Sequence, residues 1–175
     1  MTGEGLPPII LRGGGRPADK GAHVENISIR EDGDQMSDNS GPLAVGLAYS
    51  RTVAVTDEMT PAHLRQEPIR VLSTPDMIRL VEQTAIEAVA PRLATGQATV
   101  GTRVDIAHLA ATPVGMSVTI RVELVEVDRR RLGFRVEVRD ELDEVGRGTH
   151  ERFIVDAAQR LPRLEEKMRR WKAGA

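Results

Sequence analysis

Apolar residues recur at helical spacing in one part of the chain, residues 75–90. Ser73 or Thr74 can act as the N-cap of this segment, and Pro75 suits its first turn. Pro91 would end or kink the helix, because proline removes a backbone donor and clashes with the preceding turn. The pattern predicts an amphipathic helix whose buried stripe has a spacing of three or four residues: Met77, Leu80, Val81, Ala85, Ala88 and Val89.

Alternating apolar and polar positions predict five strands. Residues 47–56 form the first strand and residues 145–155 the last. Short polar turns at 128–130 and 140–144 indicate that the last three strands are antiparallel hairpins. One long helix followed by such strands predicts an α+β fold in which an antiparallel sheet wraps around the helix, the hotdog arrangement. The shared faces are Val100, Thr102, Val104, Ile106 and His108 in the second strand, Val118, Ile120, Val122 and Leu124 in the third, and Leu132, Phe134, Val136 and Val138 in the fourth.

The flanking segments differ in composition from the middle of the chain. Residues 1–44 are rich in glycine and polar residues, so they cannot bury enough apolar area to offset the entropy of ordering. We predict a disordered and dispensable leader there, with Met36 as an alternative start. Residues 45–156 form the predicted domain, with a loop or lid at 57–72. Residues 157–175 are predicted to be an amphipathic helix or tail that begins near Pro162; contact with an anionic ligand or a membrane surface is the less favoured reading.

Composition excludes several classes of protein. The chain has no cysteine, so it has no disulfide, thiol nucleophile or thiolate zinc site. Its 24 basic and 26 acidic residues argue against a general nucleic-acid binder. No apolar run approaches the roughly 20 residues that span a bilayer, and the first residues do not resemble a signal peptide. We therefore expect a cytoplasmic protein without a nucleic-acid or membrane partner.

Three polar residues near the predicted helix are candidates for chemistry. Glu82 lies among apolar ridges of the helix, although it could simply pair with Arg79. His108 continues the face of the second strand, which we expect to be buried, although a lone histidine there is commonly a core residue. Thr74 precedes a proline, where an N-cap is the more common role. Together they supply a hydroxyl, a carboxylate and an imidazole, the groups needed for an activated nucleophile and an oriented base.

Four short motifs resemble those of the fluoroacetyl-CoA thioesterase family. They are STP at 73–75, VGT at 100–102, HLAATPVGM at 108–116 and GRGTHER at 146–152, within a resemblance that covers about Val71 to Asp156. The resemblance implies a hotdog homodimer with its pocket at the interface. It also implies a catalytic set of a threonine at the helix start, a glutamate in the helix and a histidine on the next strand. These roles fall on Thr74, Glu82 and His108.

The resemblance extends to two further residues, and the chain departs from the family pattern in one segment. Gly101 matches a glycine beside the bound acyl group, although it could instead mark a bulge, and Arg152 matches an arginine near the site, although it could be a surface ion pair. Family members selective for fluoroacetyl-CoA shield the acyl pocket with phenylalanines in a lid. The corresponding stretch, Pro61 to Leu72, has no aromatic residue, and Arg65 and Pro68 fall near those positions. We expect a broader or shifted substrate scope.

The expected function is hydrolysis of a short-chain acyl-CoA to free acid and coenzyme A, with no metal and no cofactor beyond the coenzyme A of the substrate. His108 would act as general base or acid, assisted by Glu82, while Thr74 attacks the thioester or positions water. Two alternatives remain at this point. A hotdog enoyl-CoA hydratase would need an Asp and a His near each other on the helix, and no such pair occurs between Thr74 and Ala94. The other alternative is a non-catalytic acyl-CoA-binding module, which would not need the hydroxyl, the carboxylate and the imidazole.

Overall fold

A computed structural model of the 175-residue chain describes residues 43–64, 66, 68 and 70–174. The predicted leader lies outside these residues except for its last two positions, and so does the alternative start at Met36. The described helices and strands agree in number, order and approximate position with those predicted for the domain and the tail.

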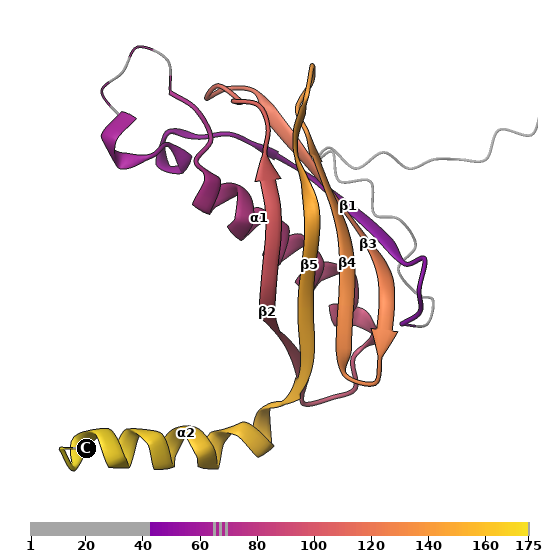
Figure 1. Cartoon of the computed structure of the whole chain (residues 1–175), viewed down its shortest axis with the longest axis vertical. Coiled ribbons are helices and arrows are strands. Elements are labelled where there is room, and N and C mark those ends of the chain that lie inside the picture. Colours follow the sequence, from indigo (N-terminus) through magenta and orange to yellow (C-terminus); the bar gives the residue numbers. More distant parts are fainter. Residues whose placement is uncertain (1–42, 65, 67, 69, 175) are drawn as a thin grey trace, which may run out of the picture. The chain divides into compact units, whose positions relative to one another are not determined.

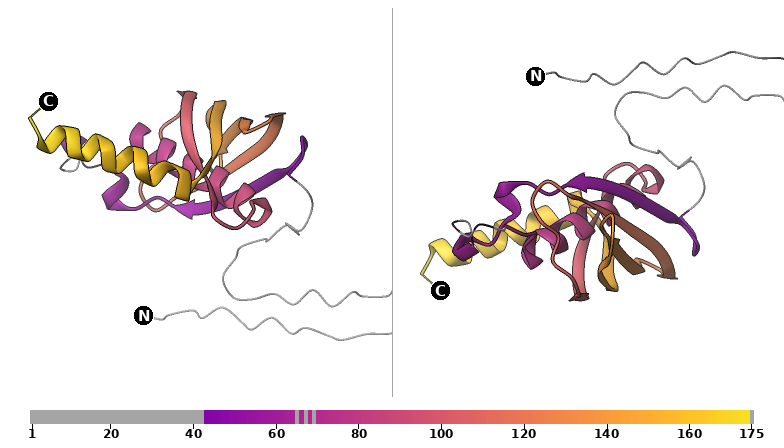
Figure 2. Two further views of the ribbon diagram at one scale, coloured as in Figure 1. Left: turned by 90° about the horizontal axis from the view of Figure 1, so that it is seen from below. Right: turned by 90° about the horizontal axis from the view of Figure 1, so that it is seen from above.

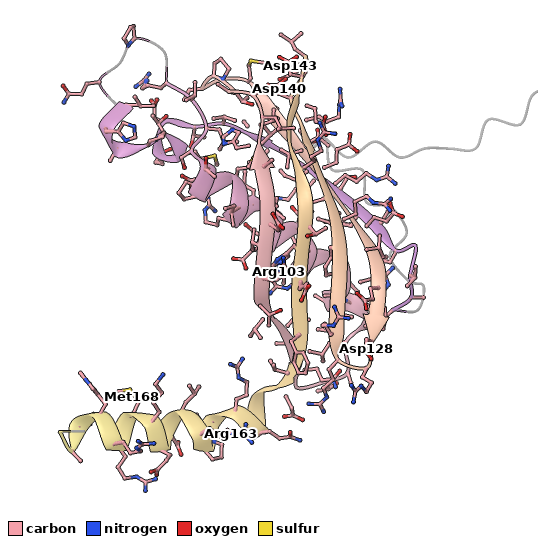
Figure 3. The ribbon with its side chains drawn as sticks, viewed as in Figure 1. Arg103, Asp128, Asp140, Asp143, Arg163 and Met168 are labelled. Carbon is pink, nitrogen blue, oxygen red and sulfur yellow. The ribbon has the colours of Figure 1, made fainter. Side chains whose placement is uncertain are left out.

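Five antiparallel strands form one sheet in the order β1-β3-β4-β5-β2 (Figure 1). Consecutive hairpins join β3, β4 and β5, as the polar turns predict. Figure 3 shows Asp128, the last residue of β3, and Asp140 of the β4–β5 turn at opposite ends of the sheet. The strands are β1 (Ala48–Ala54), β2 (Gln97–His108), β3 (Ser117–Asp128), β4 (Arg131–Arg139) and β5 (Glu144–Asp156).

The long helix α1 (Thr74–Val89) lies against one face of this sheet (Figure 2). Ser73, rather than Thr74, is the N-cap, because its hydroxyl accepts a hydrogen bond from the Asp76 N–H at 3.1 Å. A short 3₁₀ helix at Ala90–Arg92 ends the segment at Pro91. The predicted apolar stripe of α1 is buried with Val118, Ile120, Leu124 and Phe134 of the sheet. The fold is therefore α+β, with a sheet around one helix in the hotdog arrangement.

Strand β2 departs from the burial that its alternation predicts. It lies at the edge of the sheet, where it pairs with β5 on one side only. Val104 is 37% exposed, and Ile106 and His108 are only half-buried. The prediction that one face of the second strand is buried is thus wrong for a single chain. The alternation of side chains does not reveal whether a strand is central or at an edge.

The C-terminal helix α2 (Ala157–Lys172) begins earlier than predicted. Asp156 caps it by accepting hydrogen bonds from the N–H groups of Ala158 and Gln159, at 3.0 Å and 3.4 Å. Pro162 consequently lies inside the helix instead of near its start. The side chains described from Ala158 to Lys172 are all exposed. No helix among the described residues has the length and apolar character needed to cross a membrane.

The segment before α1 contains two single-turn 3₁₀ helices, Asp57–Met59 and Ala62–Leu64, within the predicted loop or lid. Its last residues run beside the loop that follows β2. Val71 forms an isolated antiparallel bridge with Pro113 there. This pairing brings the start of α1 to the end of β2.

Candidate active site

Thr74 and His108, two of the three residues predicted to be catalytic, are in contact. The Thr74 Oγ1 lies 2.9 Å from the His108 Nδ1, a hydrogen-bonding distance. Thr74 is exposed at the first residue of α1, and His108 is the last residue of β2. If Nδ1 accepts the hydroxyl proton, the pair has the geometry of an alcohol activated by an imidazole base.

Backbone pairing between two loops sets this contact. The Leu72 N–H donates to the Thr112 carbonyl at 2.9 Å, and the Val114 N–H donates to the Arg70 carbonyl at 2.8 Å. The loop after β2 is also tied to the next turn, because the buried Thr112 hydroxyl donates to Asp140 Oδ2 at 2.9 Å. The chain immediately before Thr74 and the chain immediately after His108 are therefore held side by side.

Asp140 is the acceptor that secures this loop. Burial by itself would raise the pKa of Asp140, but hydrogen bonds from the N–H groups of Asp143 and Leu142 and from the Thr112 hydroxyl bring its pKa below the ordinary value. The ionised carboxylate thus accepts three hydrogen bonds at the β4–β5 turn.

The second ring nitrogen of His108 has no hydrogen-bonding partner among the described residues. Nε2 is nonetheless shielded from solvent. When Nδ1 accepts from Thr74, Nε2 carries the ring proton, and a buried N–H without an acceptor is costly. Among the described residues, the contact between Thr74 and His108 thus leaves this ring nitrogen unpaired.

The helix start offers few free donors for a developing oxyanion. Pro75 has no N–H, the Asp76 N–H donates to the Ser73 hydroxyl, and the Met77 N–H donates to the Ser73 carbonyl at 2.9 Å. Of the first helical residues this leaves the Thr74 N–H as the candidate donor.

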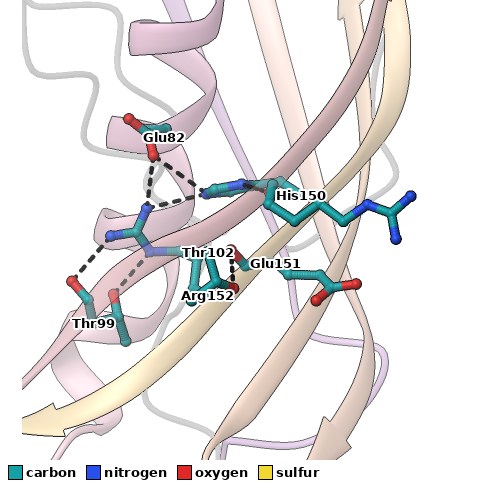
Figure 4. A network of polar contacts seen from close by, with 7 residues as sticks. Glu82, Thr99, Thr102, His150, Glu151 and Arg152 are labelled. Atoms are coloured by element: carbon teal, nitrogen blue, oxygen red, sulfur yellow. Dashed lines mark hydrogen bonds and ion pairs between the residues drawn. The ribbon is translucent and has the colours of Figure 1, made fainter.

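Glu82, the third predicted residue, lies elsewhere. It is eight residues further along α1, about 12 Å at 1.5 Å per residue. Its Oε1 is 3.7 Å from Arg152 Nη1 and 4.0 Å from His150 Nε2 (Figure 4). No hydrogen bond or ion pair joins Glu82 to His108 within the described residues. The alternative pairing of Glu82 with Arg79 is wrong, because Arg79 pairs with Asp76 at 3.2 Å.

Arg152 is buried, so the alternative that it forms a surface ion pair is wrong. Its side chain is only 3% exposed. Nε donates to the Thr99 hydroxyl at 2.9 Å, Nη2 to the Thr99 carbonyl at 3.0 Å, and Nη1 to His150 Nε2 at 3.1 Å (Figure 4). Burial lowers the pKa of Arg152 and Glu82 opposes that shift. A fully buried cation thus faces the half-exposed carboxylate of Glu82.

Gly101 is both a bulge residue and a neighbour of Glu82. The pairing of β2 with β5 shifts register between Gly101 and Arg103, which bears out the bulge reading. A Cβ at Gly101 would overlap Glu82 Oε1 and approach His150 Cε1 to 3.3 Å. The missing side chain lets the Glu82 carboxylate lie directly against the β2 backbone.

His150 is the residue of this cluster to which sequence reasoning gave no role. It lies two residues before Arg152 on β5, so both side chains point to the same face of the sheet. The available signal was that spacing: two polar residues on the same face of a strand, the face that the buried Ile154 continues. Side chains described in the structure include no group of three or more His, Asp or Glu residues placed to hold a metal ion.

Comparison with known proteins shows which family this chain resembles. Residues 55–158 match the family described as fluoroacetyl-CoA-specific thioesterase. The fluoroacetyl-CoA thioesterase of Streptantibioticus cattleyicolor is 34% identical over 119 residues, covering 65% of this chain and 86% of that protein. A solved structure of a fluoroacetyl-CoA thioesterase superposes with a TM-score of 0.67 and 34% identity, over 73% of this chain and 98% of the other.

Two further groups of solved structures extend the comparison. A Thermus thermophilus thioesterase superfamily member gives a TM-score of 0.69 with 28% identity, over 75% of this chain and 98% of that one. Variants of the fluoroacetyl-CoA thioesterase, 34% and 32% identical to this chain, were solved with fluoroacetate and coenzyme A, and with acetyl-CoA. The sequence match over most of the domain and the shared fold lead to one conclusion: this chain belongs to the fluoroacetyl-CoA-specific thioesterase family.

Proposed function

We propose that this protein hydrolyses short-chain acyl-CoA thioesters to the free acid and coenzyme A. The contact between the Thr74 hydroxyl and the His108 imidazole at the exposed start of α1 is the observation that supports this most directly. In the reaction the acyl carbon gains a hydroxyl from water, the carbon–sulfur bond breaks, and the sulfur leaves as the protonated thiol of coenzyme A.

Each residue of the proposed catalytic set has a chemical role. His108 takes a proton from Thr74 or from a water held by Thr74, and returns it to the departing sulfur. If Thr74 attacks, a threonyl ester forms and water then hydrolyses it; if water attacks, the acid forms directly. Glu82 supplies negative charge to the site, and Gly101 and Arg152 form the wall near the acyl group.

We propose that the working form is a homodimer joined at the β2 edges. A twelve-residue edge strand with exposed Val104 leaves unpaired backbone groups that a second copy can satisfy. Among the described residues of one chain, His108 Nε2 has no acceptor, and Glu82 lies too far along α1 to reach it. A second copy can bring its Glu82 near this pair across the interface, so each site takes Thr74 and His108 from one copy and the carboxylate from the other.

The substrate proposed is a small acyl group such as acetyl, without strong selection for fluoroacetyl. The segment between Pro61 and Leu72, which resembles the lid, contains no aromatic side chain to shield the acyl carbon from water. Arg65, which falls near one of the lid positions, lies outside the described residues. We further propose a cytoplasmic setting, in keeping with a chain that has no cysteine.

The test is thiol release from a panel of acyl-CoA substrates that includes acetyl-CoA, fluoroacetyl-CoA and longer chains. The expected result is turnover of the short substrates, abolished in a Thr74→Ala/His108→Ala double variant. Binding of acyl-CoA without thiol release would instead identify a non-catalytic binding module. Hydration of an enoyl-CoA without thiol release would identify a hydratase. A preference for fluoroacetyl-CoA by orders of magnitude would contradict the proposed substrate scope.

A further inference from the structure

The fully buried His150 has a defined hydrogen-bonding state. Its Nδ1 lies 2.8 Å from the Arg103 carbonyl, which can only accept, so Nδ1 carries a proton. Its Nε2 lies 3.1 Å from Arg152 Nη1, which can only donate, so Nε2 presents its lone pair. The two contacts together define a neutral imidazole with its proton on Nδ1.

The surroundings of His150 favour this neutral form. Burial lowers its pKa, and Arg152 lowers it further, while the hydrogen bond to the Arg103 carbonyl and the charges of Glu82 and Glu151 act in the opposite direction. The ring also stacks against Phe134, with centroids 6.3 Å apart. The groups that face it are therefore Glu82 from α1, the Arg103 carbonyl from β2, Phe134 from β4 and Arg152 from β5. Glu151, the next residue of β5, points to the opposite face of the sheet and acts only through its charge.

We propose that His150, together with Thr99, is a positioning residue for the reaction. This inference rests on the proposed function. His150 Nε2 and the two oxygens of Thr99 fix the guanidinium of Arg152, which in turn holds the Glu82 carboxylate against Gly101 (Figure 4). Neither His150 nor Thr99 needs to touch the substrate. Strand β2 has a bulge between Gly101 and Arg103. At this bulge the Arg103 carbonyl accepts the hydrogen bond from His150 Nδ1.

Two substitutions at the same position separate the two contacts of His150. In His150→Gln, the side-chain oxygen lies near the former Nε2 and accepts from Arg152, but the donor to Arg103 is lost. In His150→Asn, the shorter amide keeps a donor near the former Nδ1, but the acceptor for Arg152 is lost. We expect His150→Gln to keep most of kcat/KM and His150→Asn to lose about 10–100-fold, the size of a small misplacement of a reacting group.

Thr99 gives an independent pair of variants. Thr99→Ser keeps the hydroxyl that accepts from Arg152 Nε, whereas Thr99→Val removes it with little change in shape. We expect Thr99→Ser to retain kcat/KM. Thr99→Val should lower kcat/KM, as His150→Asn does. Val118→Ala, a core change on β3, serves as a control because it lowers stability without touching this cluster. Activity is measured well below the melting temperature of each variant.

Nitrogen-15 NMR of the imidazole rings tests the same arrangement without reference to activity. The expected spectrum of the unmodified protein near neutral pH shows His150 neutral and protonated at Nδ1. Equal kcat/KM for His150→Gln and His150→Asn, or a ring protonated at Nε2, would overturn the inference. If the unmodified protein releases no thiol from any acyl-CoA, the proposed function fails, whereas the NMR result still decides whether the cluster is built as described.

Discussion

Ser73 and Thr74 have separate roles at the start of α1. The Ser73 hydroxyl caps the helix, whereas the Thr74 hydroxyl contacts His108. Thr74→Ala should therefore lower kcat about 10²–10⁴-fold, the usual contribution of positioned acid–base catalysis, with little change in the free energy of unfolding. Thr74→Ser should retain more activity because it keeps the hydroxyl.

Ser73→Ala is the matched control for this prediction. It should lower the free energy of unfolding by about 0.5–2 kcal/mol through loss of the cap and spare the hydroxyl of Thr74. Steady-state kinetics and urea unfolding of the three variants provide the comparison. A Thr74→Ala protein with normal turnover would place the active site elsewhere.

Gly101 and Gly148 lie in strands that pair with each other, but a methyl group at each position meets different atoms. At Gly101 the new Cβ overlaps the end of the flexible Glu82 side chain, whereas at Gly148 it overlaps the backbone of Asp105 and Ile106. Gly101→Ala should keep the fold and displace the Glu82 carboxylate, with a loss of kcat/KM of about tenfold or more. Gly148→Ala should mainly lower the melting temperature, because backbone cannot yield as a side chain can.

Burial of neutral His150 makes stability depend on pH. Because its pKa is lower in the folded chain than the ordinary 6.5, the unfolded chain binds more protons as the pH falls below about 6.5. The free energy of unfolding should then decrease from about pH 6.5 down to the lowered pKa, and should not respond to His150 above that window. Urea unfolding across this range should show a flatter profile for His150→Gln than for the unmodified protein.

At the scale of elements, the contact between α1 and β2 depends on the loop that joins β2 to β3. Thr112 in that loop is fully buried and donates its hydroxyl to Asp140, and its carbonyl accepts from the Leu72 N–H. Thr112→Val keeps the shape but removes the donor. It should lower the free energy of unfolding by about 1.5–3 kcal/mol, the usual contribution of a hydrogen bond to a charged group. Turnover should also fall, because this loop follows His108 directly and pairs with Leu72, two residues before Thr74.

A second threonine-to-valine substitution, at Thr52 in the sheet, serves as the control for Thr112→Val. The Thr52 hydroxyl lies 2.9 Å from the Thr119 hydroxyl in an exposed contact between β1 and β3. Thr52→Val should change the free energy of unfolding much less and leave turnover intact. If Thr112→Val and Thr52→Val behave alike in both assays, the loop does not set the position of Thr74 relative to His108.

At the scale of the whole molecule, the proposed dimer makes each active site depend on two copies. A Thr74→Ala/His108→Ala protein and a Glu82→Gln protein should each be nearly inactive. Mixed and allowed to exchange subunits, they should regain activity, because a mixed dimer with shared sites contains one complete set of the three groups. Thiol release before and after mixing measures this.

The outcome separates two arrangements of the site. No recovery, in a sample that light scattering shows to be dimeric and exchanging, would mean that each copy carries its own complete site. A monomer at micromolar concentration would rule out the dimer itself.

Much of the fold follows from local patterns in the sequence. The stripe from Met77 to Val89 defines α1 because helical periodicity is a property of neighbouring residues, and the alternation of β3 and β4 defines their buried faces in the same way. The motifs around Thr74 and His108 indicated the family, and the resemblance implied a catalytic set of Thr74, Glu82 and His108. The structure brings only Thr74 and His108 of this set into contact among the described residues.

The tertiary structure decided what depends on distant parts of the chain. The position of β2 at the sheet edge, and so the exposure of Val104, follows from the order in which strands pair, which periodicity does not contain. Sequence spacing suggested Arg79 as the partner of Glu82, but the sheet brings Arg152 and His150 to that carboxylate. Which charges meet is decided by packing between elements, because a buried ion or imidazole is stable only where the rest of the fold supplies its partners.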